Sequence, residues 1–283
     1  MKRQVAIQGV AGCFHDIAAR AYFKNDEVET VPCNTFRQLF DSVKNDQQMI
    51  GIVAIENTIA GSLLQNHNLL RDSGLQIVGE HKLRIKQNLV ALPGQKVDDI
   101  KEAYSHPIAL MQCKEFLNEH SHIKAVESED TALSAKLIAE EGESARGKAA
   151  ICGELAAELY GLEVLAKSIE TNKHNFTRFL IVTDRWNVEE MMMGRCPNKS
   201  SFVFTLTHEE GSLAKVLSIL SYYGLNLTKI QSLPIMGREW EYQFYVDLKF
   251  SNYLKYKQGV DAIIPLTKDL IILGEYEEGE QTI

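Results

Sequence analysis

The chain has 283 residues, of which 45% are hydrophobic and 24% are charged, and its formal net charge is −8. This length predicts two folding units, and the composition is that of ordinary globular domains. The acidic balance and the lack of a lysine- or arginine-rich run argue against a nucleic-acid-binding protein, because phosphate backbones are bound by clustered basic residues.

The start of the chain and its cysteines indicate a reducing, cytoplasmic setting. Gln4, Gln8 and Gly9 interrupt what would have to be the apolar core of a signal peptide. No window reaches the roughly 18 apolar residues of a membrane span. The five cysteines are odd in number and scattered, without a C-x-x-C pair. We therefore expect neither a disulfide framework nor a zinc site.

Short apolar runs alternate with helical patterns from Val5 to about residue 183. The apolar runs predict strands at 5–8, 49–55, 103–106, 123–126 and 149–152. Helical spacing of apolar residues predicts helices at 14–22, 63–70, 107–118, 131–139 and 154–160. Gly74 is placed to end the second of these helices. The alternation indicates an α/β domain with a mostly parallel sheet. Two longer extended segments, 75–92 and 163–183, are candidates for crossings between the lobes of a split domain.

The pattern changes after Thr183. Residues 184–199 are rich in turn formers around Met191-Met192-Met193, which indicates a linker. From Ser200 onward, the predicted elements lie at 202–207, 213–223, 227–232, 242–248, 253–264 and 270–276. Their order, strand-helix-strand-strand-helix-strand, is the βαββαβ order of ferredoxin-like domains.

Small polar clusters stand at four predicted strand-to-helix junctions, at 9–12, 56–58, 105–107 and 130–131. Each alone is most simply a helix cap, but four in one domain favour a shared cleft for a small anion. The histidines at 15, 106 and 174 are candidate acid–base groups, although isolated histidines are more often surface or capping residues. No nucleophile elbow, Walker loop, metalloprotease motif or complete dinucleotide fingerprint is present.

Several motifs resemble the prephenate dehydratase family. Residues 54–62, with Glu56-Asn57-Thr58, resemble its glutamate-asparagine-serine/threonine motif. Residues 105–113 resemble its serine-histidine-proline segment, and Asn-Phe-Thr-Arg-Phe at 175–179 matches its threonine-arginine-phenylalanine signature. Residues 211–217 and 237–242 resemble an ACT domain. The resemblance covers nearly the whole chain in the expected order. In the first loop, Val10, Cys13 and His15 replace the family's proline, threonine and serine.

The resemblance implies a two-lobed catalytic domain like periplasmic binding proteins over residues 1–184. A linker at 185–199 and a ferredoxin-like ACT regulatory domain at 200–283 would follow. The implied reaction converts prephenate to phenylpyruvate, water and carbon dioxide in L-phenylalanine biosynthesis. Aromatisation drives this reaction, so neither a cofactor nor a metal is expected. The implied partners are phenylalanine as effector and further copies of the chain in a homodimer or homotetramer.

The resemblance also assigns residues to the site. Thr177 is the expected catalytic residue, whose hydroxyl hydrogen-bonds or protonates the departing hydroxyl group. Arg178 is expected to bind a substrate carboxylate, with a structural ion pair as the alternative. Glu56 is expected to be structural. The remaining substrate-binding candidates are Asn57, Thr58, Ser105, Gln112, Thr131 and Phe179.

For the effector, the resemblance points to the loop before the first helix of the ACT-like part. Gly211 permits close approach of the backbone, and the amides of Ser212 and Leu213 suit an amino acid's carboxylate. Asn226 is expected to contact its ammonium group. Gln231 and Leu233 replace two charged residues of the usual glutamate-serine-arginine-proline element, which leaves the identity of the effector open.

Two other functions stay open. Arogenate dehydratase performs the same reaction on the transaminated side chain. A non-enzymatic sensor of small acids would not need Thr177. We expect no chorismate mutase domain upstream, because the first predicted strand begins at Val5.

Overall fold

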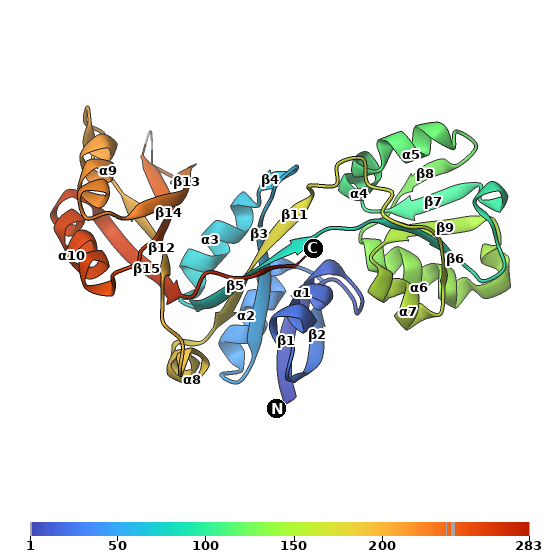
Figure 1. Ribbon diagram of the computed structural model, residues 1–283, viewed down its shortest axis with the longest axis horizontal. Helices are drawn as coiled ribbons and strands as arrows, with labels where there is room; N and C mark the ends of the chain where they lie inside the picture. Colours follow the sequence, from blue (N-terminus) through green and yellow to red (C-terminus); the bar gives the residue numbers. More distant parts are fainter. Residues whose placement is uncertain (1, 236, 239–240, 283) are drawn as a thin grey trace.

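The computed structural model describes residues 2–235, 237–238 and 241–282. The molecule is elongated, with three bodies in a row (Figure 1). A first α/β unit lies in the centre, a second α/β unit lies on one side, and a four-stranded unit with two helices lies on the other. Within the described ranges, every helix is too short or too polar to cross a bilayer.

The first unit is built on a mixed sheet with the order β16-β5-β11-β3-β1-β2, and β4 pairs with β3. Its strands are β1 (Lys2–Gln8), β2 (Glu27–Cys33), β3 (Ile50–Asn57), β4 (Gly61–Ser62), β5 (Gln76–Arg84), β11 (Phe176–Thr183) and β16 (Gln281–Thr282). Its helices are α1 (Phe14–Tyr22), α2 (Phe36–Asn45) and α3 (Leu64–Ser73). β3 is apolar and buried from Ile50 to Ile55, as expected of a central strand. Gly74 ends α3 with φ +74°, as predicted.

The predicted parallel character holds for only part of this sheet. β1 runs parallel to β2 and β3, but β11 runs antiparallel to both β3 and β5. The reason is that β5 leads out of the first unit and β11 leads back into it. The segment 27–45, for which no elements were predicted, contains β2 and α2.

The second unit has a five-stranded sheet with the order β10-β6-β9-β7-β8. Its strands are β6 (Asn88–Ala91), β7 (Glu102–Ser105), β8 (Lys124–Glu127), β9 (Lys148–Cys152) and β10 (Glu163–Ala166). Its helices are α4 (Pro107–Gln112), α5 (Lys114–Glu119), α6 (Thr131–Glu141) and α7 (Glu154–Tyr160), with 3-10 turns at Val97–Asp99 and Gly142–Ala145. The helix predicted at 107–118 is thus two helices, separated at Cys113.

The chain passes between the two α/β units twice, from β5 to β6 and from β10 to β11 (Figure 1). The two passages are hydrogen-bonded to each other. Ile85 N donates to Asn175 O at 2.8 Å, and Ile169 N donates to Gln87 O at 2.8 Å. Each of the long extended segments singled out in the sequence contains one of these passages.

The segment after β11 is more ordered than a linker. A 3-10 turn at Arg185–Asn187 leads into α8 (Val188–Met192). Met191 is buried against the core of the first unit, whereas Met193 is 77% exposed. Met191, together with Val188 and Met192, packs this helix against the core, which the turn-rich composition of the segment did not predict.

The four-stranded unit has the predicted βαββαβ order. Its elements are β12 (Lys199–Thr205), α9 (Ser212–Tyr222), β13 (Asn226–Pro234), β14 (Tyr242–Lys249), α10 (Tyr253–Ile263), a 3-10 turn at Ile264–Leu266 and β15 (Lys268–Tyr276). The strands form an antiparallel sheet with the order β13-β14-β12-β15. Phe202 and Phe204 of β12 pack in a core with residues of α9 and α10, while Val203 packs with core residues of the first unit. Alternation along the strand therefore gives this sheet two buried faces.

The chain returns to the first unit after β15. β16 pairs parallel with β5, and Lys82 N donates to Glu280 O at 3.0 Å. Gly279 passes so close to the backbone of Glu80 that an added Cβ would lie 1.8 Å from its carbonyl oxygen. The sequence did not predict this return, because two residues cannot carry a strand pattern by themselves.

Candidate active site between the two α/β units

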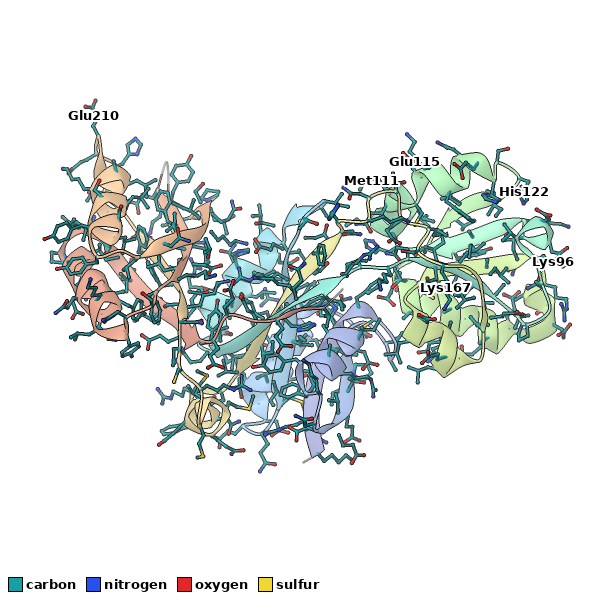
Figure 2. All side chains as sticks on the ribbon, viewed as in Figure 1. Lys96, Met111, Glu115, His122, Lys167 and Glu210 are labelled. Carbon is teal, nitrogen blue, oxygen red and sulfur yellow. The ribbon has the colours of Figure 1, made fainter. Side chains whose placement is uncertain are left out.

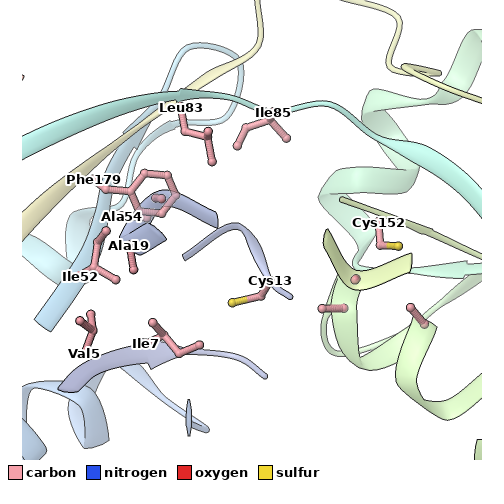
Figure 3. Packing of buried hydrophobic residues seen from close by; sticks show 14 of the residues in the cluster. Val5, Ile7, Cys13, Ala19, Ile52, Ala54, Leu83, Ile85, Cys152 and Phe179 are labelled. Atoms are coloured by element: carbon pink, nitrogen blue, oxygen red, sulfur yellow. The ribbon is translucent and has the colours of Figure 1, made fainter. Parts of the chain in front are cut away.

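A cavity of about 510 Å³ lies between the first and second α/β units. This volume is in the usual range for small-molecule sites. The expected site residues that line it are Asn57, Gln112, Thr131, Thr177 and Phe179. Figure 3 shows Cys13 and Phe179 on the first unit, Cys152 on the second, and Ile85 on a segment that joins them. Cys13 and Phe179 line the cavity from the first unit, Gln112 and Thr131 from the second, and Ile85 from a passage.

Thr177 is oriented as a hydrogen-bond donor. It lies near the start of β11, where its backbone pairs with Asn57 on one side and Leu83 on the other. Asn57 Nδ2 donates to Thr177 Oγ1 at 2.9 Å. The threonine oxygen is therefore the acceptor in that bond, and the described residues provide no acceptor for its O–H. The hydroxyl hydrogen is left for a group in the cavity.

A chain of amide groups holds this donor in place. Asn57 Oδ1 accepts from the N–H groups of Ile59 and Ala60 at 2.9 and 2.8 Å, which fixes the orientation of its amide. The Nδ2 of Asn57 also donates to Asn175 Oδ1 at 2.8 Å. Asn175 Nδ2 in turn donates to Gln112 Oε1 at 2.9 Å. The network thus links β3 of the first unit to α4 of the second.

Aromatic side chains form an apolar wall of the cavity. The ring of His15 packs edge-on against Phe179 with centroids 5.0 Å apart, and against Phe36 at 5.6 Å. Burial lowers the pKa of His15 to about 3. His15 is therefore neutral at physiological pH, and its Nε2 accepts from Ala54 N at 3.3 Å. It serves as part of the wall and not as a proton donor.

Two acidic groups in the cavity are held toward their neutral forms. Burial raises the pKa of the Cys13 thiol to about 12, so it is not a thiolate. Burial also raises the pKa of Asp130, although backbone amides at the start of α6 oppose this. Asp130 caps α6 by accepting from Leu133 N at 2.9 Å. A Cβ on Gly9, where φ is +106°, would lie 3.1 Å from Asp130 Oδ2, so glycine permits the first loop to approach the second unit.

Arg178, which was expected to bind a substrate carboxylate, does not line this cavity but a neighbouring pocket that shares Asn57 and Ser62 with it. Adjacent side chains of a strand point to opposite faces, so Thr177 and Phe179 face the cavity and Arg178 faces away. Its guanidinium donates to Glu80 Oε2 at 2.6 Å, to Asp247 Oδ2 at 2.5 Å and to Tyr276 OH at 3.0 Å. The structural ion pair, which was the alternative, is the arrangement present.

Arg178 belongs to a cluster that we call the buried ion cluster. It contains three cations and three carboxylates: Arg178, Lys199, Lys229, Glu56, Glu80 and Asp247. Burial opposes charge on Asp247, but Arg178 and Ser201 outweigh it and hold the pKa of Asp247 below its usual value. The cluster lies directly behind the cavity, because Glu56 precedes Asn57 and Arg178 follows Thr177. It joins the first unit to the four-stranded unit.

Thr58 and Ser105 are held by backbone groups outside the cavity lining. Thr58 Oγ1 donates to His174 O and accepts from Phe176 N, both at 2.9 Å. Ser105 is fully buried, and its hydroxyl donates to Ile151 O at 2.6 Å. Their hydroxyls fasten β3 to β11 and β7 to β9. Both hydroxyls therefore support the strands that form the site.

The residues expected to bind an effector lie far from the cavity, in the four-stranded unit. Figure 2 shows Glu210 projecting at the tip of the loop before α9. Gly211 adopts φ +76°, as its expected role requires, but Ser212 N already donates to Glu209 O at 3.2 Å. Of the two backbone amides that were expected to bind a carboxylate, only that of Leu213 is then available. Asn226 begins β13 and is exposed.

The cavity lining is mostly apolar, with several polar side chains, and it carries no lysine or arginine among the described residues. Its donors are neutral amides and hydroxyls, and α1 and α6 begin at it. Helix starts and neutral donors bind anions without a formal positive charge. The residues with described positions include no group of three histidine, cysteine or carboxylate side chains suited to a metal ion.

Residues 5–187 match the family model described as Prephenate dehydratase, over more than half of the chain. This chain belongs to the prephenate dehydratase family. It is 35% identical over 266 residues to arogenate dehydratase/prephenate dehydratase 1 of Arabidopsis thaliana, covering 88% of this chain and 65% of that protein. It is 30% identical over 277 residues to the bifunctional chorismate mutase/prephenate dehydratase of Aquifex aeolicus, covering 97% of this chain and 74% of that protein. The chain thus spans about two thirds of the length of such relatives.

Two solved structures share the fold over nearly the whole chain. The prephenate dehydratase of Staphylococcus aureus has a TM-score of 0.81 and 26% identity, covering 97% of this chain and all of that one. GqqA, described as a novel type of quorum quenching acylase, has a TM-score of 0.86 and 30% identity, covering 98% of each chain. This fold is thus shared with a protein that is described by another activity.

Sequence reasoning did not assign Asn175, Asp130 or Gln87 to the site of this prephenate dehydratase family member. Asn175 directly precedes the Phe-Thr-Arg-Phe motif, so its position was a usable signal. Asp130 stood in a polar junction cluster, where a helix cap was the simpler interpretation. Gln87 lies in a passage between units and carries no local signal.

Proposed function

We propose that this chain is a prephenate dehydratase that converts prephenate to phenylpyruvate, water and carbon dioxide. The observation that carries the proposal is the hydrogen bonding of the Thr177 hydroxyl. Its oxygen accepts a hydrogen bond from Asn57, so its hydrogen stays available to a group bound in the cavity. A preorganised donor of this kind stabilises the oxygen that leaves as water. The family membership of residues 5–187 supports the same reaction.

The other lining residues fit the remaining needs of the reaction. The amide of Gln112 and the start of α6 at Thr131 offer neutral donors for carboxylate groups. The wall of His15, Phe36 and Phe179 gives the ring an apolar surface. Loss of carbon dioxide together with the hydroxyl group leaves an aromatic ring, because the electron pair of the broken C–C bond enters the ring as the C–O bond breaks. The chain's own residues therefore orient the dianion, exclude water and donate a hydrogen bond to the leaving oxygen.

We assign the catalytic domain to residues 1–184, as a two-lobed domain of the periplasmic-binding-protein type. The two α/β units joined by two passages support this assignment. We assign residues 185–199 to a connecting segment and 200–283 to an ACT domain, on the basis of its βαββαβ order and antiparallel sheet. The short β16 lies in the sheet of the catalytic domain despite its place in the chain.

An acylase reaction, as described for GqqA, fits the cavity less well. Amide hydrolysis needs an activated nucleophile beside a base. The cavity thiol of Cys13 has a pKa raised to about 12, and the Nε2 of His15 accepts a backbone N–H. The hydroxyl of Ser62 accepts from Lys229 Nζ at 3.3 Å, but that ammonium also donates to Glu56 at 2.5 Å. Lys229 is thus engaged in an ion pair with Glu56.

The decisive experiment is an ultraviolet assay of phenylpyruvate formation from prephenate, run in parallel with arogenate. Wild-type protein is expected to form product, with and without a chelator, because the site residues donate hydrogen bonds and none needs a metal. Thr177→Ala serves as the inactive control. Binding of prephenate without turnover would point instead to the small-acid sensor, and preferred turnover of arogenate would identify an arogenate dehydratase.

For regulation, we propose that phenylalanine binds where the loop before α9 meets a second copy of the chain in a homodimer or homotetramer. Gly211 and the Leu213 amide would hold its carboxylate, and Asn226 its ammonium group. The buried ion cluster offers a route to the cavity, because Lys229 and Asp247 of the ACT domain pair with residues next to Asn57 and Thr177. Inhibition requires that phenylalanine and substrate weaken each other's binding by the same factor.

Calorimetric titration of phenylalanine, alone and with a substrate analogue, tests this route. Wild-type protein is expected to show reciprocal coupling, and Lys229→Met should retain phenylalanine binding with weaker coupling. Lys257→Met, which removes a half-exposed lysine of α10, is the matched control and should leave the coupling unchanged. No binding at millimolar phenylalanine would overturn the effector assignment.

A further inference from the structure

Gln87 lies in the short passage between β5 and β6, where the chain leaves the first α/β unit. Its N–H donates to Glu170 Oε2 at 2.9 Å, and its carbonyl accepts from Ile169 N at 2.8 Å. Glu170 is itself 1% exposed and belongs to the returning passage. These bonds tie the two passages together and fix the backbone of Gln87.

The side-chain amide of Gln87 is buried but unpaired. The residue is 2% exposed and lines the cavity, and its Oε1 has no hydrogen-bond partner among the described residues. Those residues give Nε2 no partner either. Other buried polar atoms without partners are Asn66 Oδ1, His67 Nε2 and Arg84 Nε, and none of these residues lines the cavity. A buried amide without hydrogen bonds destabilises a fold, so its retention in a binding cavity needs a reason.

Gln87 and Thr177 lie apart along the wall of the cavity, which suits them to different groups of a small ligand. Thr177 pairs with Leu83 across β11 and β5. Gln87 lies four residues beyond Leu83 along an extended passage, and at about 3.3 Å per residue this is a separation of about 13 Å along the chain. If Thr177 donates to the leaving hydroxyl, Gln87 faces the other end of the ligand. In prephenate, the ring carboxylate and the three-carbon side chain lie across the ring from the hydroxyl.

Building on the dehydratase function above, we propose that Gln87 is a positioning residue that hydrogen-bonds the three-carbon side chain of the substrate. That side chain carries a keto group in prephenate and an ammonium group in arogenate. A carboxamide is both a donor and an acceptor, so its Nε2 suits the keto oxygen and its Oε1 suits the ammonium group. With no protein partner to fix its orientation, the amide of Gln87 is free to turn either way.

The test compares Gln87→Met with Gln95→Met. Gln95 is also buried, but its amide is paired, with Oε1 accepting from Gly147 N at 2.7 Å and Nε2 donating to Leu92 O at 3.4 Å. Gln87→Met should raise the KM for prephenate about tenfold, with kcat within about threefold of wild type and an unchanged or higher Tm. Gln95→Met should lower the Tm and leave KM unchanged. An unchanged KM in Gln87→Met would overturn the proposal, as would a fall in Tm like that of the control.

Gln87→Glu tests which substrate group is bound. A carboxylate accepts from ammonium but repels a keto acid, so the ratio of kcat/KM for arogenate to that for prephenate should rise at least about tenfold. An unchanged ratio would overturn the assignment to the side chain. Failure of the proposed function looks different, because wild-type protein would then form no product from either substrate. That result would overturn both proposals, whereas normal wild-type turnover with an unaffected Gln87→Met variant overturns this one alone.

Discussion

Replacing Asp247 with asparagine is expected to destabilise the protein strongly. Asp247 lies in the four-stranded unit and does not line the cavity. Asp247 is 6% exposed, and its two oxygens accept from Arg178 and from Ser201, both at 2.5 Å. Asparagine keeps the shape but removes one of three carboxylates that balance three cations. Arg178 then keeps Glu80 as its close carboxylate partner but stays partly uncompensated in a buried position.

The size of the effect follows from known buried pairs. Breaking such a pair typically costs about 3–5 kcal/mol. Since the asparagine oxygen still accepts one hydrogen bond and Arg178 keeps Glu80, we expect the lower end, about 3 kcal/mol. With an unfolding entropy of about 2.1 cal/mol/K per residue, 1 kcal/mol shifts the Tm of a chain of 283 residues by slightly under 2 °C, so the variant should melt about 5 °C below wild type. Thermal unfolding followed by circular dichroism measures this.

Glu154→Gln is the matched control, because it breaks an exposed ion pair with Lys167 at 2.7 Å and should leave the Tm unchanged. The pH dependence gives a second check. The depressed pKa of Asp247 means that its contribution is present above its usual value of 3.8 and is lost at lower pH. The gap between wild type and Asp247→Asn should therefore narrow below about pH 4. A Tm for Asp247→Asn equal to that of the control would refute the reasoning.

Three further predictions concern the cavity and the C-terminal segment. Thr177→Ala should lower kcat about 100-fold or more with KM largely kept, whereas Thr177→Ser should retain much more activity; steady-state kinetics decide, and near-normal turnover of the alanine variant would remove Thr177 from the mechanism. Because burial raises the pKa of Asp130, its ionisation at higher pH should raise the KM for the dianionic substrate, and Asp130→Asn, which keeps the helix cap, should flatten that pH profile. A profile identical to wild type would exclude this role. Burial disfavours the charge of Glu278, but Lys249 and Lys82 outweigh it and lower its pKa to about 2, so its contribution is present above pH 4.5 and lost toward pH 2. Glu278→Gln should therefore lower the Tm at pH 7 and approach wild type in acid, and an equal deficit at both pH values would contradict the ion-pair explanation.

Local sequence signals determined much of the secondary structure and the family. Gly74 and the apolar run in β3 were readable because caps and strand patterns depend on neighbouring residues alone. The βαββαβ order of the C-terminal part followed from such signals, and so did the helix at Glu154–Tyr160. The motifs around Asn57 and Thr177 pointed to residues that line the cavity, because the sequence itself carries these motifs.

The tertiary structure decided which of these side chains reach the cavity. Arg178 follows Thr177 in sequence, yet its carboxylate partner Asp247 lies 69 residues away, and that pairing places a residue that was expected to bind substrate in a buried ion pair. Ser105 was expected to bind substrate, but its hydroxyl donates to the carbonyl oxygen of Ile151 in β9. The amide of Gln87 could be recognised as unpaired only from the structure, because no local sequence pattern shows which side chains lack a partner. Contacts between distant segments depend on how the units pack. For that reason the sequence by itself determined the elements and motifs, but not which partner each side chain contacts.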